Sequence, residues 1–164
     1  MTGSEELWVN LQEKSLYKVS STVYCLPLFG GCNSCELDAL QQLQNRAARI
    51  ALNLPQMSNR KSMYVELEWL TVRQLIVYHT LILVFRVRQS GAPSALARQL
   101  LSENYRGNII VKNSHLELYK RSFVPRGATL WNKLPLGVKM MKNIGIFKKH
   151  LKDWVMNNVK MMED

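Results

Sequence analysis

The stretch from Val72 to Gln89 constrains the fold of this chain more than any other feature of its sequence. Apolar residues would cover nearly the whole circumference of a helix here, rather than one stripe. These residues are Leu75, Ile76, Val77, Tyr78, Leu81, Ile82, Leu83, Val84, Phe85 and Val87. A helix that is apolar on all sides has to be buried on all sides. The densest apolar run is about half of the roughly 20 residues that span a membrane, and His79 and Arg86 interrupt it. The stretch therefore predicts a central helix that other elements of the domain cover.

Signals at both ends of this stretch predict where the helix begins and ends. Thr71 followed three residues later by Gln74 is a capping box, in which the hydroxyl accepts from a backbone N–H and the amide reaches back. After the helix, Gly91 can adopt a left-handed conformation and Pro93 cannot continue a helix.

The remaining segments predict a mainly α fold, a compact helical domain around the central buried helix (about 72–89). Helical periodicity is found over residues 5–24, from the cap pair Asn33 and Glu36 to Pro55, and over 58–70, 95–101, 127–134 and 143–155. Ile109 to Val111 and Ser122 to Val124 have strand-like composition, which allows one short β-hairpin near 109–124. We expect a single domain over 1–164: a helical N-terminal arm (1–31), a helical core (33–102), and a strand or loop followed by a basic C-terminal helix (103–164).

Positive charge is concentrated toward the C-terminal end. The net charge of +10 is high for 164 residues, and it makes a polyanion the first partner to consider, with nucleic acid ahead of an anionic membrane. Between Leu118 and Lys152 there are nine basic residues and no acidic one. In the last predicted helix, lysines face away from an apolar face that contains Phe147 and Leu151.

A second basic face is predicted on the helix that Asn33 opens. Arg46 and Arg49 lie one turn apart, with Gln42 and Asn53 on the same face. The opposite face is an apolar stripe of Leu37, Leu40, Leu43, Ala47, Ile50 and Leu54. Two arginines at this spacing suit a phosphate group, and the spacing suits a solvated helix face equally well. The candidates for contacts with backbone phosphates are Arg46, Arg49, Arg121, Arg126, Lys148, Lys149 and Lys152.

The residues that catalysis, cofactors or metals would need are sparse. The three Asp residues lie far apart, so no carboxylate pair for two-metal chemistry is expected, and no Gly-rich phosphate loop occurs. His79 is interpreted as a hydrogen-bonded core histidine. Cys25, Cys32 and Cys35 are interpreted as reduced cysteines, with metal binding as the alternative. We therefore expect no enzymatic activity, no cofactor and no metal site in this chain alone.

Three segments in order carry a family resemblance. The first is Leu43-Gln44-Asn45-Arg46-Ala47-Ala48-Arg49-Ile50. The second runs from Leu67-Glu68-Trp69-Leu70 through Tyr78-His79 and Val84-Phe85 to Gly91-Ala92-Pro93. The third runs from Lys120-Arg121-Ser122-Phe123 through Leu130-Trp131-Asn132-Lys133-Leu134-Pro135 to Phe147-Lys148. Together they resemble the region C-terminal to the polymerase domain in non-LTR (LINE-type, jockey-like) retrotransposon reverse transcriptases, from about Tyr24 to Trp154.

The resemblance implies origin in a protein that reverse-transcribes element RNA at a nicked chromosomal target, without the polymerase aspartates, endonuclease residues or zinc knuckle of that family. It implies a non-catalytic fragment that binds the backbone of RNA or DNA, located in the nucleus or the cytoplasm, with no membrane partner. The alternative is a helical interaction piece that packs on a polymerase domain and has no ligand of its own. Under that alternative, part of the apolar surface around the central helix would be an interface. Trp131 and Phe147 are interpreted as core anchors in either case.

Overall fold

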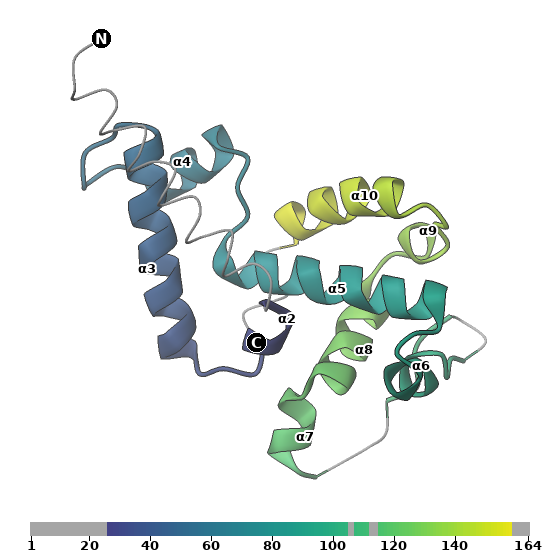
Figure 1. Cartoon of the computed structure of the whole chain (residues 1–164). Coiled ribbons are helices and arrows are strands. Elements are labelled where there is room, and N and C mark those ends of the chain that lie inside the picture. Colours follow the sequence, from purple (N-terminus) through teal and green to yellow (C-terminus); the bar gives the residue numbers. More distant parts are fainter. Residues whose placement is uncertain (1–25, 105–106, 112–114, 159–164) are drawn as a thin grey trace.

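The computed structural model describes residues 26–104, 107–111 and 115–158, and these form a mainly helical fold (Figure 1). The predicted helix over 5–24 and Cys25 lie outside the described ranges. The helices are α2 (Leu26–Phe29), α3 (Ser34–Ala51), α4 (Arg60–Glu66), α5 (Val72–Ser90), α6 (Ser94–Leu100), α7 (Glu117–Arg121), α8 (Phe123–Lys133), α9 (Leu136–Lys139) and α10 (Ile144–Asn157).

Helix α5 is the central element, as its sequence predicts. It packs against α10 on one side and α8 on the other, against α6 near its C-terminal end, and against α2 and α3 near its N-terminal end (Figure 1). Leu81 and Val84 have no exposed surface, whereas Arg86 and Gln89 are exposed. The apolar residues of α5 are therefore largely covered from within the chain.

Both predicted ends of α5 are confirmed. The Thr71 hydroxyl accepts a hydrogen bond from the Gln74 backbone N–H at 3.3 Å, and the Gln74 side chain accepts one from the Thr71 N–H at 2.9 Å. Gly91 follows the helix with φ of 68°, a left-handed conformation that costs glycine little. Local sequence alone accounts for these boundaries.

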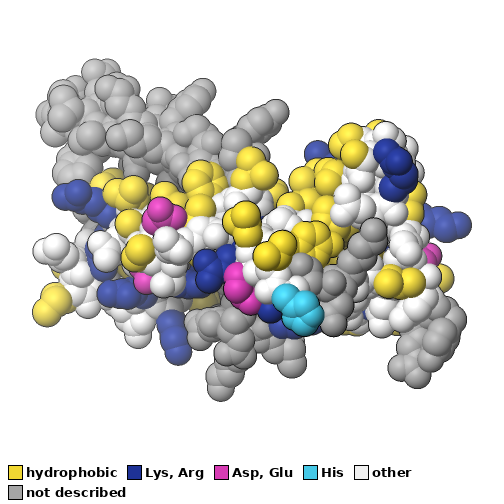
Figure 2. All heavy atoms as spheres, turned by 90° about the horizontal axis from the view of Figure 1, so that it is seen from below, with side chains coloured by type: hydrophobic (Ala, Val, Ile, Leu, Met, Phe, Trp, Pro, Cys, Tyr) yellow, Lys and Arg dark blue, Asp and Glu magenta, His cyan; other side chains and the backbone are white. Residues whose placement is uncertain are grey.

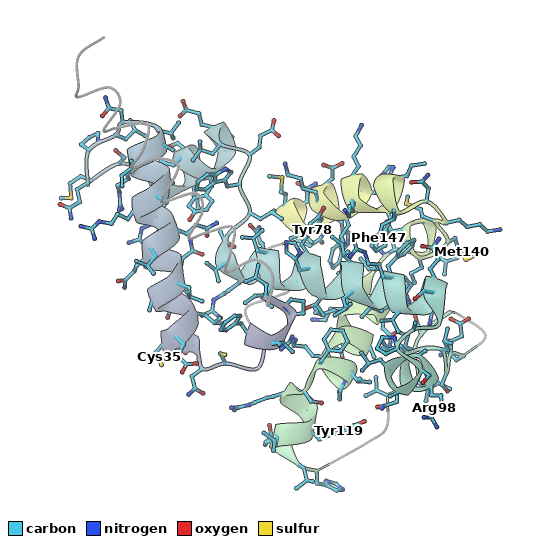
Figure 3. All side chains as sticks on the ribbon, viewed as in Figure 1. Cys35, Tyr78, Arg98, Tyr119, Met140 and Phe147 are labelled. Carbon is cyan, nitrogen blue, oxygen red and sulfur yellow. The ribbon has the colours of Figure 1, made fainter. Side chains whose placement is uncertain are left out.

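The main hydrophobic core lies between α5, α8 and α10. Phe147 has no exposed surface, and its ring stacks on Phe85 with the centroids 4.2 Å apart. Trp131 of α8 is 2% exposed and lies 6.1 Å from Phe147, centroid to centroid. Figure 3 shows Phe147 in the layer between α10 and α5, near Tyr78. Trp131 and Phe147 are core anchors, as predicted.

A buried polar network joins α3 and α4 to the start of α5. The Tyr64 hydroxyl donates to Asn45 Oδ1 at 2.8 Å and accepts from Gln41 Nε2 at 2.6 Å. Gln41 Oε1 also accepts from the backbone N–H of Val72 at 2.9 Å, and Gln44 Nε2 donates to the Leu70 carbonyl at 2.8 Å. Because the network satisfies buried polar groups of three elements, it holds α3 and α4 in one position relative to α5.

The predicted hairpin near 109–124 is wrong. Ile109 makes an isolated antiparallel bridge with Glu103, and no strand is found in the described ranges. Ser122 to Val124 instead lead into α8, with Ser122 at the N-cap position and Pro125 in the first turn. Proline is tolerated there because the first N–H groups of a helix have no intrahelical partner.

Several other boundaries differ from prediction. Helix α4 covers only Arg60–Glu66 of the expected 58–70, because the Asn59 side chain caps it at Lys61 N and Glu68 adopts φ of 50°. Asn33 is at the N-cap position of α3, but its side chain makes no capping hydrogen bond. The last helix, by contrast, is capped as predicted: Asn143 accepts from Gly145 N at 2.7 Å and from Ile146 N at 3.3 Å.

Candidate nucleic-acid interface

The outward face of α3 and the start of α4 line a groove with a volume of about 890 Å³. Its lining residues are Ala39, Gln42, Leu43, Asn45, Arg46, Arg49, Ile50, Asn53, Leu54, Gln56 and Arg60. No Asp or Glu is among them. Figure 2, a view from below, shows Lys and Arg side chains on several parts of the surface, with few Asp or Glu side chains beside them. We call this hollow the arginine groove.

The three arginines of the groove have no ion-pair partner among the described residues. Arg46 and Arg60 are exposed, and Arg49 is half-buried, with its Nε enclosed and without a hydrogen-bond partner in the described part of the chain. Burial raises the pKa of the Tyr64 hydroxyl to about 12. The hydrogen bond from Gln41 and the positive charges of Arg49 and Arg60 act in the opposite direction and lower this pKa. The groove therefore presents positive charge that no carboxylate within 26–104, 107–111 or 115–158 neutralises.

The local sequence explains why these arginines point outward. In the segment Gln44-Asn45-Arg46-Ala47-Ala48-Arg49, Gln44 and Asn45 are 4% and 5% exposed and belong to the polar network. Ala47 and Ala48 are buried as well, so α3 lies close to its neighbours along that side. Helical spacing then turns Arg46 and much of Arg49 to the opposite side. The predicted face of Gln42, Arg46, Arg49 and Asn53 is found together in the groove.

The sequence pattern placed Leu43, Ile50 and Leu54 on the apolar stripe, whereas the structure has them in the lining of the arginine groove. It also missed Gln56 and Arg60 of the groove. They reach it because the chain reverses direction after α3. Asn53, with φ of 52°, begins this reversal, and Asn59 caps α4 immediately before Arg60. The Asn59-Arg60 pair was the available signal, since a helix capped at Asn59 places Arg60 in its first turn.

The predicted lysines of α10 form a separate basic surface. Lys149 is exposed, Lys148 is half-buried, and Lys152 Nζ lies 3.4 Å from the Glu68 carboxylate. Phe147 and Leu151 on the opposite side of α10 are fully buried, which confirms the predicted amphipathic arrangement. The lysine surface is thus partly neutralised by Glu68, unlike the arginine groove.

His79 lies near this lysine surface. Its ring meets Tyr78 edge to face with the centroids 5.3 Å apart. Burial first, and then the charges of Lys148 and Arg86, lower the pKa of His79 and favour its neutral form. His79 was predicted to be a hydrogen-bonded core histidine, but its side chain is only half-buried. In the described part of the chain its ring makes no hydrogen bond, so that prediction is not confirmed.

Arg126, another predicted phosphate contact, is half-buried, and part of its guanidinium is already bound within the chain. Its guanidinium donates to the Pro27 carbonyl and occupies the space that a Cβ on Gly30 would need. Arg126 therefore packs against α2 and the turn after it, where no phosphate could approach all of its donors. Arg121 at the end of α7 is exposed and remains a candidate, but it lies apart from the arginine groove, which does not include it.

Cysteine and acidic residues form no cluster with metal-binding geometry in the described ranges. Cys32 is half-buried and Cys35 is exposed at the start of α3, and Figure 3 shows Cys35 at the end of that helix near α2. Burial, followed by the neighbouring Glu36, raises the pKa of the Cys32 thiol, which favours the protonated form.

No helix among the described residues is long and apolar enough to cross a membrane. In comparisons with known proteins, no family model, no curated protein and no solved structure matches this chain.

Proposed function

We propose that this chain is a non-catalytic helical module that binds the phosphate backbone of nucleic acid. In this proposal it corresponds to the region downstream of the polymerase domain in LINE-type reverse transcriptases. The observation that carries it is the arginine groove, in which Arg46, Arg49 and Arg60 line one hollow with no carboxylate from the described part of the chain.

The chemistry of arginine favours a phosphate ligand in this groove. The guanidinium group is always charged near neutral pH, and its planar fork of donors matches two oxygens of one phosphate. Arg73, by comparison, is already paired with the Asp38 carboxylate at 3.1 Å. Arg46, Arg49 and Arg60 have no such partner among the described residues, so their donors are available to an anion.

A salt titration of binding tests the proposal. Fluorescently labelled RNA and DNA oligonucleotides would be titrated with the whole chain at several salt concentrations, using Arg46→Gln/Arg60→Gln as the variant, because both side chains are exposed. Each phosphate contact contributes about 0.7 to 0.9 to the slope of log K against log salt, so the variant should bind more weakly with a slope smaller by roughly 1.5.

Arg98→Gln is the matched control, because Arg98 is also an exposed helical arginine and lies at the other end of the molecule, on α6 (Figure 3). It should leave affinity and slope almost unchanged. Absence of salt-dependent binding by the wild-type chain would refute the proposal, and equal losses in both variants would refute the role of the groove.

The proposal also predicts that the chain does not extend a primer on an RNA template with any divalent metal ion. The three Asp residues are far apart in sequence, and no metal-binding group of three side chains is formed in the described ranges. Template-dependent nucleotide incorporation above a control without protein would contradict this.

Packing on a polymerase domain is a second candidate function, favoured by apolar side chains at the corner between α9 and α10. Leu136, Met140 and Ile146 are 63%, 74% and 54% exposed. The interface would lie here and not around α5, whose apolar surface is covered within the chain. Sedimentation of the chain mixed with the polymerase domain of a LINE-type reverse transcriptase tests it, and Met140→Ser/Ile146→Ser should abolish any complex.

A further inference from the structure

The arginine groove differs from a simple cationic surface because apolar and amide side chains lie between its charges. Leu43 is 61% exposed and Leu54 is 37% exposed, although both are large and apolar. Gln42, Asn53 and Gln56 add amide groups, which both donate and accept hydrogen bonds. A ligand that fills this groove has to offer anionic, apolar and hydrogen-bonding groups together.

Single-stranded nucleic acid offers these three kinds of group to one surface. Its phosphates lie beside bases that are free to present both a flat face and a hydrogen-bonding edge. A duplex turns its bases inward and presents mainly phosphates and sugars to a surface of this kind. The composition of the groove therefore matches a single strand better than a duplex.

The position of Arg49 adds a geometric argument. Its Nε is enclosed by protein, so the inner end of the guanidinium is held in the groove wall and less conformational freedom remains to be lost on binding. Planar guanidinium groups stack on bases in single-stranded complexes. Among the residues that the structure describes, no aromatic side chain lines the groove, so Arg49 and the neighbouring leucines would provide the surfaces on which bases rest.

The lysine surface of α10 has a different character. Lys148, Lys149 and Lys152 are flexible point charges on the outer side of one helix, and Lys152 is already paired with Glu68. Such a surface can attract any polyanion without distinguishing a strand from a duplex.

We propose that the arginine groove binds a single-stranded segment of nucleic acid in preference to duplex, an inference that rests on the proposed function. Arg46 and Arg60 contact phosphates, and Leu43, Arg49 and Leu54 contact bases. From Ala39 to Ile50 the helical wall of the groove is about 16 Å long, which suits a short stretch of strand and not a compact mononucleotide alone.

The test compares oligo(dT), oligo(U) and a mixed-sequence duplex of equal length by fluorescence anisotropy with the whole chain. Leu43→Ser/Leu54→Ser is the informative variant, because both side chains are exposed and their loss leaves the core intact. It should weaken binding of both single strands by about three- to tenfold. The salt slope should not change, because apolar contacts release no counterions. Duplex binding should be unaffected.

Two control variants complete the experiment. Leu118→Ser replaces a leucine that is 85% exposed on α7, away from the groove, and should change nothing. Lys148→Gln/Lys149→Gln/Lys152→Gln should weaken single strands and duplex by the same factor and flatten both salt slopes.

The outcomes separate this inference from the proposed function. Unchanged single-strand affinity in Leu43→Ser/Leu54→Ser, or an equal loss for duplex, would overturn the preference for single strands while leaving backbone binding in place. Failure of the wild-type chain to bind any of the three oligonucleotides would overturn both.

Discussion

Replacing Gly127 with alanine tests the close approach of α8 to α5. A Cβ at Gly127 would lie 2.9 Å from Val84 Cγ2 and 3.7 Å from Thr80 Cγ2, and real Cβ atoms essentially never come as close as the first distance. Val84 has no exposed surface and its branched side chain strongly prefers one rotamer in a helix, so it cannot rotate away. The two helices would have to move apart.

Two opposing effects set the size of the change. Overpacking a core typically costs about 1–3 kcal/mol. Alanine is favoured over glycine inside a helix by about 1 kcal/mol. Gly127→Ala should therefore lower the free energy of unfolding by up to about 2 kcal/mol, a sizeable part of the stability of a small domain. Urea unfolding followed by circular dichroism measures it, and the denaturant slope should not change.

Gly137→Ala is the matched control, because Gly137 is also helical and has nothing within 4 Å of its added Cβ. It should raise stability by up to about 1 kcal/mol. In a Val84→Ala background, where the obstructing methyl groups are gone, Gly127→Ala should become stabilising too. Equal stabilisation by Gly127→Ala and Gly137→Ala in the wild-type chain would refute the described packing of α5 on α8.

Three further predictions follow from buried side chains and caps. Trp131→Ala should lower the free energy of unfolding by about 3–5 kcal/mol, because Trp131 is only 2% exposed. Thr129→Ala, on the exposed side of α8, should change it by less than about 0.5 kcal/mol. Thermal melts of the two variants and the wild-type chain measure the difference. Burial raises the pKa of Tyr64 from 10.0 to about 12, so folding favours the neutral phenol. The stabilisation of the folded state by this group is complete below pH 10 and is lost as the pH rises toward 12. The free energy of unfolding should fall by at most about 3 kcal/mol for this reason. Urea unfolding between pH 10 and 12 should show that the free energy of unfolding falls less in Tyr64→Phe than in the wild-type chain. An identical fall in both proteins would contradict the raised pKa of Tyr64. Thr71→Ala should cost about 1 kcal/mol by removing the α5 cap, measured in the same way, and no loss would mean that the cap contributes nothing.

The sequence predicted the parts of the candidate site that depend on one helix. Helical spacing put Gln42, Arg46, Arg49 and Asn53 on one face of α3, and all four line the groove. It put Leu43, Ile50 and Leu54 on the opposite face, whereas these residues line the same groove. Arg60 was missed because the chain reversal after α3, and not helical spacing, brings it to the groove. The sequence did not reveal that Pro27, 99 residues earlier in the chain, accepts a hydrogen bond from Arg126.

The sequence alone determined the central helix, its two ends and the amphipathic character of α10, because periodicity and capping act over only a few residues. Tertiary structure decided that Ser122 to Val124 begin a helix despite their strand-like composition, since Phe123 and Val124 pack against the main core. It also decided which cations remain unpaired and that α8 approaches α5 at Gly127. The physical reason is that burial, ion pairing and helix crossing depend on residues far apart in the chain, whose meeting no local pattern records.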